Sequence, residues 1–83
     1  MQTEEIKSLL EQNIPEVMVT ITGDGTHFEA VIVSDLFNGK TLVQQHQIVY
    51  RALGDKMGTD IHALSLQTYT PEQWEKHKDL RVI

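Results

Sequence analysis

Two alternating segments joined by a glycine-rich loop constrain the fold of this chain most strongly. Between Glu16 and Thr22, apolar side chains occupy every second position, which is typical of a strand buried on one face. The segment from Phe28 to Val33 alternates in the same way and becomes apolar throughout toward its end, which indicates burial on both faces there. The loop of residues 23–27 carries glycines on both sides of Asp24, and glycine adopts the positive φ angles of tight reversals. The sequence therefore predicts a β-hairpin with an apolar face that a second layer must cover.

Two short helices are predicted near the ends of the chain. The first has Thr3 as its N-cap, because acidic residues fill the following turn, and its apolar residues recur at helical spacing up to residue 13. The second begins at Thr70, where Thr-Pro-Glu-Gln supplies an N-cap, a proline at the first helical position and Gln73 as a capping-box partner. This helix carries Trp74 and ends in a charged run. A third strand is predicted directly before it, over residues 61–69.

The longest helix is predicted from Thr41 to Met57, after a turn marked by an Asn-Gly pair. Gly54 lies inside this segment and should loosen the helix, and Gly58 is predicted to be the residue just beyond its end. One apolar stripe runs along the helix and comprises Leu42, Val49, Leu53 and Met57.

The predicted element order is α-β-β-α-β-α within a single domain over residues 1–83. The fold class is α+β, with a three-stranded mixed sheet and helices over one face in two layers. The long helical connection permits the second and third strands to run parallel, whereas the first two form an antiparallel hairpin. The predicted core comprises Ile6, Leu9, Val19, Ile21, Phe28, Ile32, Leu42, Val49, Leu53, Leu64 and Leu66.

Composition excludes several classes of function. The chain has no cysteine, which excludes disulfides, thiolate catalysis and any cysteine-ligated metal or cluster built by this chain alone. Its longest apolar stretches are about five residues, far short of a membrane span, and acidic residues near Met1 do not resemble a signal peptide. We therefore expect no membrane association and a cytoplasmic location. The net charge of −5 opposes nucleic-acid binding unless a local basic patch provides it.

The four histidines are the candidates for metal ligation near neutral pH. His46 lies on the apolar stripe of the long helix and is predicted to pack at the edge of the core. His77 lies in the charged terminal helix and is predicted to be solvated. His27 closes the hairpin loop and His62 opens the third strand, at positions where a scaffold displays functional side chains. From the residues alone, each is either a surface histidine or part of a site.

Enzymatic motifs are lacking in the sequence, and we expect no enzymatic activity. It contains no phosphate-binding G-x-x-x-x-G-K-[ST] loop, no H-E-x-x-H zinc motif and no nucleophile with a spaced base. Gly23-Asp24-Gly25 is not a phosphate fingerprint, because a strand rather than a helix follows it. A metal held by His27 and His62 would lack a full set of ligands, which implies a site shared with another molecule.

The sequence resembles the BolA family along nearly its whole length. The motifs that carry the resemblance are Leu36-Phe37-Asn38-Gly39-Lys40, Gln45-His46-Gln47-Ile48-Val49-Tyr50-Arg51-Ala52-Leu53, Ile61-His62-Ala63-Leu64-Ser65 and Tyr69-Thr70-Pro71-Glu72-Gln73-Trp74. The loop Gly23-Asp24-Gly25-Thr26-His27-Phe28 resembles the small YrbA/IbaG-like branch. The family fold is an α-β-β-α-β-α arrangement related to class II KH domains, the same order that the hydrophobic pattern predicts.

The resemblance implies a partner of monothiol glutaredoxins that shares a [2Fe-2S] cluster in iron-sulfur trafficking or iron homeostasis, with a link to stress responses. A glutaredoxin thiolate and glutathione would ligate one side of the cluster, and His62 and His27 occupy the family's candidate ligand positions on the other. The isolated protein would hold no cluster, and it would be a monomer or a homodimer. Imidazole ligation would also make the cluster sensitive to pH, because only a neutral histidine binds metal.

A nucleic-acid-binding regulator is the alternative, since the family includes proteins described as transcriptional regulators and its fold is related to KH domains. Its candidate contacts are Lys40, Arg51 and Lys56. Gln45-His46-Gln47 replaces the Arg-His-Arg of many members, so two cations are missing and any DNA binding is expected to be weak. The function as a glutaredoxin partner that shares an iron-sulfur cluster is therefore favoured over nucleic-acid binding. A small scaffold that binds some other protein through the long helix is the third possibility.

Overall fold

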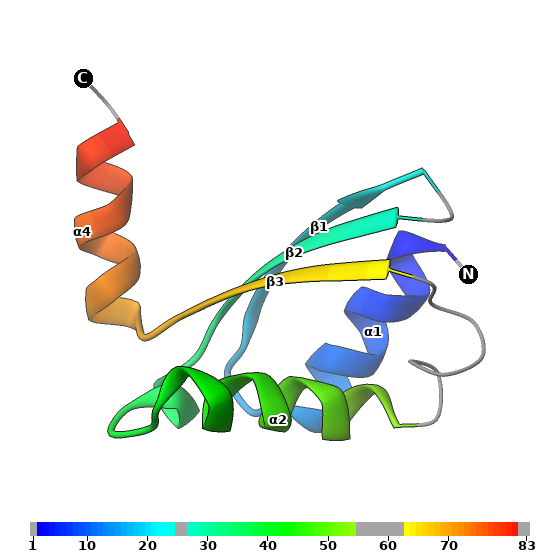
Figure 1. Ribbon diagram of the computed structural model, residues 1–83, viewed down its shortest axis with the longest axis horizontal. Helices are drawn as coiled ribbons and strands as arrows, with labels where there is room; N and C mark the ends of the chain where they lie inside the picture. The colour runs from blue at the N-terminus through cyan, green and yellow to red at the C-terminus, as the bar shows by residue number, and fades with distance from the viewer. Residues whose placement is uncertain (1, 25–26, 55–62, 82–83) are drawn as a thin grey trace.

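The computed structural model describes residues 2–24, 27–54 and 63–81. Its elements follow the predicted order (Figure 1). They are α1 (Thr3–Asn13), β1 (Met18–Gly23), β2 (His27–Val33), the 3-10 helix η1 (Asp35–Phe37), α2 (Leu42–Leu53), β3 (Ala63–Tyr69) and α4 (Pro71–Arg81). No helix in these ranges is both long and apolar enough to cross a membrane.

The three strands form one mixed sheet in the order β1-β2-β3. β1 pairs with β2 antiparallel, so that Val19 lies opposite Ile32, and β2 pairs with β3 parallel, so that Phe28 lies opposite Leu64. The predicted hairpin and the parallel return through the long helix are both confirmed. The α+β class is confirmed with them.

α1 and α2 form the second layer over one face of the sheet (Figure 1). α4 instead leaves the end of β3 and extends away from that layer (Figure 1). The sequence of α4 accounts for this, because charged and polar residues dominate it and provide no apolar stripe to bury against the sheet.

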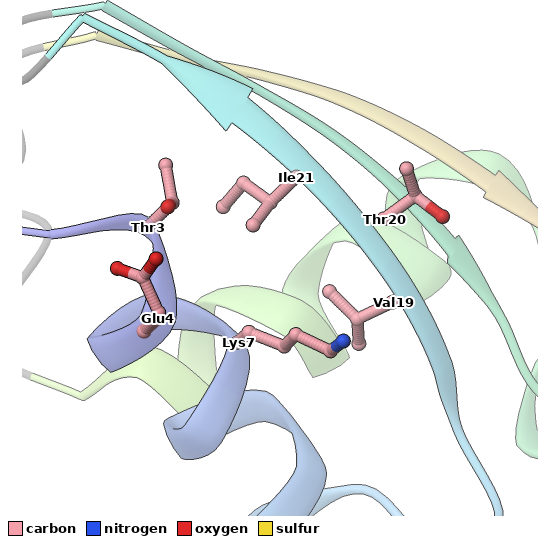
Figure 2. Close-up of a pocket in the computed structure, with 6 residues that line it drawn as sticks. All are labelled: Thr3, Glu4, Lys7, Val19, Thr20 and Ile21. Atoms are coloured by element: carbon pink, nitrogen blue, oxygen red, sulfur yellow. The ribbon is translucent and has the colours of Figure 1, made fainter.

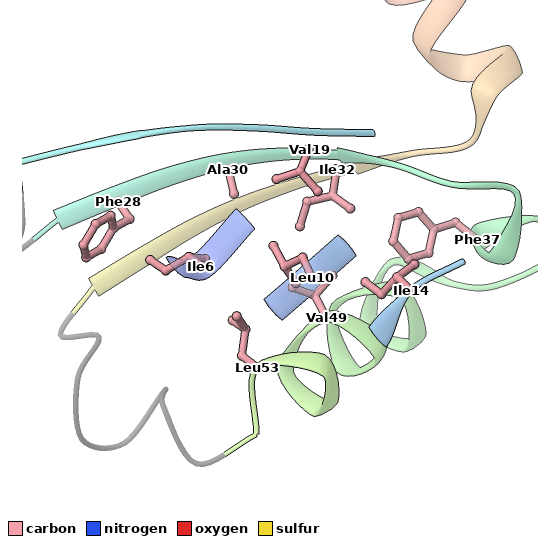
Figure 3. Packing of buried hydrophobic residues seen from close by; sticks show 10 residues of the cluster. All are labelled: Ile6, Leu10, Ile14, Val19, Phe28, Ala30, Ile32, Phe37, Val49 and Leu53. Atoms are coloured by element: carbon pink, nitrogen blue, oxygen red, sulfur yellow. The ribbon is translucent and has the colours of Figure 1, made fainter. Parts of the chain in front are cut away.

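The core fills the space between the sheet and these two helices (Figure 3). Its buried side chains are Ile6, Leu10, Ile14, Val19, Phe28, Ala30, Ile32, Phe37, Val49 and Leu53. Four further predicted core residues pack against this cluster and are partly buried, namely Leu9, Ile21, Leu64 and Leu66. The prediction for Leu42 is wrong, because its side chain is 62% exposed. Phe37 was not predicted, since it lies in the short η1, where no periodicity marks a buried face.

Two predicted helix ends also differ from the structure. The N-cap of α1 is Gln2 rather than Thr3, and no side-chain hydrogen bond caps the helix. α2 ends at Leu53 rather than Met57, because Gly54 adopts a φ of 62° and its N–H donates to the carbonyls of Tyr50 and Arg51. Gly58, the residue expected beyond the helix, lies outside the described residues.

The capping box of α4 is confirmed. The backbone N–H of Gln73 donates to the Thr70 hydroxyl at 3.2 Å, and the side-chain oxygen of Gln73 accepts from the Thr70 backbone N–H at 3.0 Å. The sequence therefore fixes the beginning of this helix locally, although the rest of the helix lies away from the core.

Candidate functional site

His27 is the first residue of β2 and its side chain is exposed. The backbone at this position is held firmly, because the His27 N–H donates to Asp24 Oδ1 at 2.9 Å and the Asp24 N–H donates to the His27 carbonyl at 3.2 Å. Both bonds use the backbone of His27, and its imidazole takes part in neither. Within the described ranges, no hydrogen bond of that imidazole is found.

The parallel register brings the start of β3 beside His27. Ala63, the residue that follows His62 in the sequence, is the pairing partner of His27. His62 itself lies outside the described residues, so its predicted role remains a prediction. The register places the first described residue of β3 at the same end of the sheet as His27, which the sequence order alone does not do.

The histidine ligands that the sequence predicts suit a shared group rather than one held by this chain alone. Among residues 2–24, 27–54 and 63–81, no group of three or more histidine, cysteine or acidic side chains could hold a metal ion. Since the chain contains no cysteine, His27 and His62 would supply at most two imidazoles. The residues fit a [2Fe-2S] cluster only if another molecule provides the thiolates.

Two of the three cations predicted to contact nucleic acid line one pocket beside α2. This cavity has a volume of about 400 Å³, and its walls come from Gly39, Lys40, Gln44, Gln47, Ile48 and Arg51. None of the described residues that line it carries a carboxylate. Lys56, the third predicted cation, lies outside the described residues.

Comparison with known proteins places these features in a family. The model for BolA-like proteins matches residues 6–73, which is most of the chain. The chain belongs to the BolA family. Among its relatives is the acid stress protein IbaG of Escherichia coli K12, which is 36% identical over 96% of both chains. The DNA-binding transcriptional regulator BolA of the same organism is 40% identical over 69% of this chain and 54% of that protein.

Solved structures confirm that the fold is the BolA fold. A BolA protein homologue from Coxiella burnetii matches 90% of this chain and 97% of its own, with a TM-score of 0.83 and 47% identity. A BolA-like protein from Babesia bovis matches 94% of both chains, with a TM-score of 0.80 and 28% identity.

The other two histidines of this BolA-family protein lie away from His27 on helices. His46 is half-buried on α2 and meets the ring of Tyr50 edge-on at 6.5 Å, which confirms its predicted place at the edge of the core. Its Nε2 is buried and has no hydrogen-bond partner in the described structure.

His77 was predicted to be solvated, and this prediction is wrong. Its side chain is half-buried because the ring stacks on Trp74, with centroids 5.6 Å apart, and lies 5.0 Å from the ring of Tyr69. The three-residue spacing of Trp74 and His77 on one helix could have indicated this contact. The contact from Tyr69 depends on the direction in which α4 leaves β3.

A second cavity lies between the first turn of α1 and the edge strand β1 of the BolA fold. Its volume is about 330 Å³, and Figure 2 shows Val19 and Ile21 pointing from β1 toward the α1 residues that line it, Thr3, Glu4 and Lys7. Glu4 and Lys7 give its mouth opposite charges and no histidine lines it, so it contains none of the predicted site residues.

Proposed function

We propose that this BolA-family protein is a non-catalytic partner of a monothiol glutaredoxin, with which it shares a [2Fe-2S] cluster in iron-sulfur trafficking or iron homeostasis. The observation that supports the proposal is the pairing of His27 with Ala63, the residue that follows His62 in the sequence, at one end of the sheet. The glutaredoxin thiolate and glutathione supply the remaining ligands, because this chain has no thiol.

The contribution of this chain to the proposed cluster is imidazole ligation, with His27 at an accessible end of the sheet. The exposed ring of His27 can be reached by a docked partner, while its backbone is fixed by the bonds with Asp24. The same proposal assigns the protein to the cytoplasm, where glutaredoxin thiols stay reduced, and to a stress response, as for the relative named an acid stress protein.

Reconstitution of the cluster tests this proposal. The protein is mixed anaerobically with a monothiol glutaredoxin, glutathione and iron, and the cluster is followed by visible absorption and circular dichroism. His62→Ala and His27→Ala should each change the spectrum of the mixed complex, because each removes an imidazole that the proposal assigns to the cluster. His77→Ala is the matched control, since it removes an imidazole from α4 and should leave the spectrum unchanged.

Two results would contradict the proposal. If neither the His62 nor the His27 variant alters the spectrum, this chain does not ligate the cluster. If acidification through the range in which histidine protonates leaves the cluster signal flat while the protein stays folded, imidazole ligation is also refuted, because a protonated imidazole has no lone pair for iron.

A nucleic-acid-binding function is the second candidate, and the pocket formed in part by Lys40 and Arg51 is the observation that favours it. The relative named a DNA-binding transcriptional regulator supports it as well. The net charge of −5 opposes it, and so does Gln47, an exposed position where many members carry arginine. Gln45 has no bearing on it, because its side chain is buried in this fold. Titration with duplex DNA near physiological salt should show weak, steeply salt-dependent binding. Sub-micromolar, sequence-selective binding that survives added salt would instead favour the regulator function.

A further inference from the structure

β1 is an edge strand, because the strand order of the sheet is β1-β2-β3. An edge strand leaves alternate backbone N–H and C=O groups without a neighbouring strand. The hairpin turn identifies these groups on β1. The Asp24 N–H donates to the His27 carbonyl at 3.2 Å, so these two residues form a hydrogen-bonded pair of the antiparallel ladder. Such pairs alternate with pairs that exchange no hydrogen bonds, and in the register of the hairpin Val19 and Ile21 belong to the second kind.

Val19 and Ile21 therefore direct their backbone N–H and C=O groups away from β2 and toward the open edge of the sheet. Within the described parts of the chain, no hydrogen bond from another element to these groups is found. Thr20, between them, bonds β2 instead and its side chain is exposed. β1 thus offers hydrogen-bonding positions at every second residue, which is the spacing that another strand requires.

A groove lies along this edge. The cavity of about 330 Å³ is lined on the strand by Val19, Thr20 and Ile21, and because these residues are consecutive, the cavity lies against the backbone edge of β1. Its other wall is the beginning of α1, and Figure 2 shows Val19 and Ile21 pointing toward that wall. We call this cavity the edge groove. A groove between an edge strand and a helix admits an extended chain, which pairs with the strand through main-chain hydrogen bonds.

The surroundings of the edge groove are acidic. Residues 3–23, which comprise α1, β1 and their connection, contain four glutamates and one lysine. Glu4, Lys7 and Glu11 share one stripe of α1, because they lie three and four residues apart, and all three are exposed. Glu29 adds a further exposed carboxylate on β2. An incoming segment that carries cations is therefore attracted to this side of the protein, and one that carries carboxylates is repelled.

We propose that the edge groove binds an extended, basic segment of a partner protein that has apolar side chains at every second position. The segment adds to the sheet as a further strand beside β1, and its backbone pairs with Val19 and Ile21. Its apolar side chains enter the cavity against these two residues, while its cations are attracted by the surrounding carboxylates. None of the residues that line the groove is a candidate cluster ligand, so the proposal does not rest on cluster ligation.

Charge favours this occupant over a second copy of the chain or a nucleic acid. Pairing of β1 with β1 of an identical copy would bring together two segments that each have an excess of three negative charges, which is unfavourable. The same carboxylates repel the phosphates of a nucleic acid. A basic extended segment satisfies both the unpaired backbone groups and the charge around them.

Short synthetic peptides test the proposal on the intact protein. A peptide of alternating valine and lysine is titrated into the isotope-labelled apo protein and compared with one that has glutamate in place of lysine. The lysine peptide should bind at least about tenfold more tightly than the glutamate peptide. It should also slow the hydrogen exchange of the Val19 and Ile21 amides, which face the edge, and leave that of Thr20 unchanged, because the Thr20 amide faces β2.

N-methylation of the lysine peptide separates strand addition from simple apolar contact. One version carries methyl groups on the valine amides and the other carries them on the lysine amides. Only alternate amides of an added strand face β1, so methylation of one set should weaken binding at least about tenfold and methylation of the other by less than about twofold. Equal effects of the two sets would refute strand addition.

Charge reversal on α1 tests the role of the carboxylates. Glu4→Lys with Glu11→Lys should weaken binding of the lysine peptide at least about fivefold and strengthen binding of the glutamate peptide. The matched control is Glu72→Lys with Glu75→Lys, which makes the same change of charge on α4 and should leave the preference for lysine unchanged. Far-UV circular dichroism verifies that each variant is folded, and the methylated peptides test the unaltered protein.

Four results would overturn the proposal. Two of them are equal binding of the lysine and glutamate peptides, and unchanged exchange of the Val19 and Ile21 amides at saturating peptide. The third is protection of these amides by the protein alone as its concentration rises, which would assign the edge to a second copy. The fourth is displacement of the lysine peptide from the groove by a DNA oligonucleotide.

Discussion

Replacing Gln45 with methionine tests the polar link that joins α2, the loop before it and β3. The Gln45 side chain is buried, and its amide nitrogen donates to the carbonyls of Phe37 at 3.3 Å and Lys40 at 3.0 Å. Its oxygen accepts from the hydroxyl of Thr68 at 2.7 Å, and Thr68 is also buried. Methionine has a similar length, but it cannot donate to the two carbonyls and offers the Thr68 hydroxyl only a weak sulfur acceptor.

The expected loss of stability follows from the three bonds. Each buried hydrogen bond stabilises the fold by about 1 kcal/mol, so Gln45→Met should cost about 3 kcal/mol. A domain of 83 residues is stable by roughly 4 to 12 kcal/mol at typical values per residue, so this is a large fraction of the total. Thr68→Val in the same background removes a hydroxyl that would otherwise be left unpaired. The double variant should therefore be more stable than the sum of the single changes predicts, by about 1 kcal/mol.

Urea unfolding followed by far-UV circular dichroism measures these differences. The control is Gln47→Met, which makes the same change at an exposed position on the same helix and should alter stability by less than about 0.5 kcal/mol. The reasoning is refuted if Gln45→Met falls within the range of the control. It is also refuted if the effects of Gln45→Met and Thr68→Val are strictly additive.

Three further changes test single features of the fold. His46→Phe should stabilise the protein by about 1 kcal/mol in thermal unfolding, because it removes a buried, unpartnered nitrogen and keeps an aromatic edge against Tyr50; a lower melting temperature would contradict this. Gly39→Ala should cost about 1 to 2 kcal/mol in urea unfolding although nothing crowds the position, since Gly39 has a φ of 73°; an unchanged midpoint would show that the turn relaxes. Thr70→Ala should destabilise α4 by about 1 kcal/mol, seen as faster amide exchange in its first turn with little change in α1; unchanged exchange would mean that the cap contributes nothing.

Much of the secondary structure could be predicted because its signals are local. The alternation of Phe28, Ala30 and Ile32 identifies the buried face of β2, and the capping box of Thr70 and Gln73 identifies the start of α4. In both cases the interacting groups are neighbours along the chain. The resemblance to the BolA family predicted how these elements assemble into one fold, and the comparisons with known proteins confirm that fold.

The candidate site could be predicted only as separate residues. His27 was expected at the end of the hairpin loop, but its pairing with Ala63 depends on the register between two strands that α2 separates in the sequence. The spacing of apolar residues along the sequence does not specify that register. It indicates which face of a strand is buried, but not which residue of another strand lies opposite.

The sequence by itself determined the element order, the buried face of each hairpin strand and the start of α4. The tertiary structure alone decided that Leu42 is exposed while Gln45 is buried on the same helix. The apolar pattern favours the opposite assignment, but the orientation of α2 is set by packing against the sheet. The burial of Gln45 is possible because Thr68, 23 residues away, donates a hydrogen bond to it. A polar side chain is stable in a core only where the whole fold brings it a partner, and spacing along one helix cannot specify that partner.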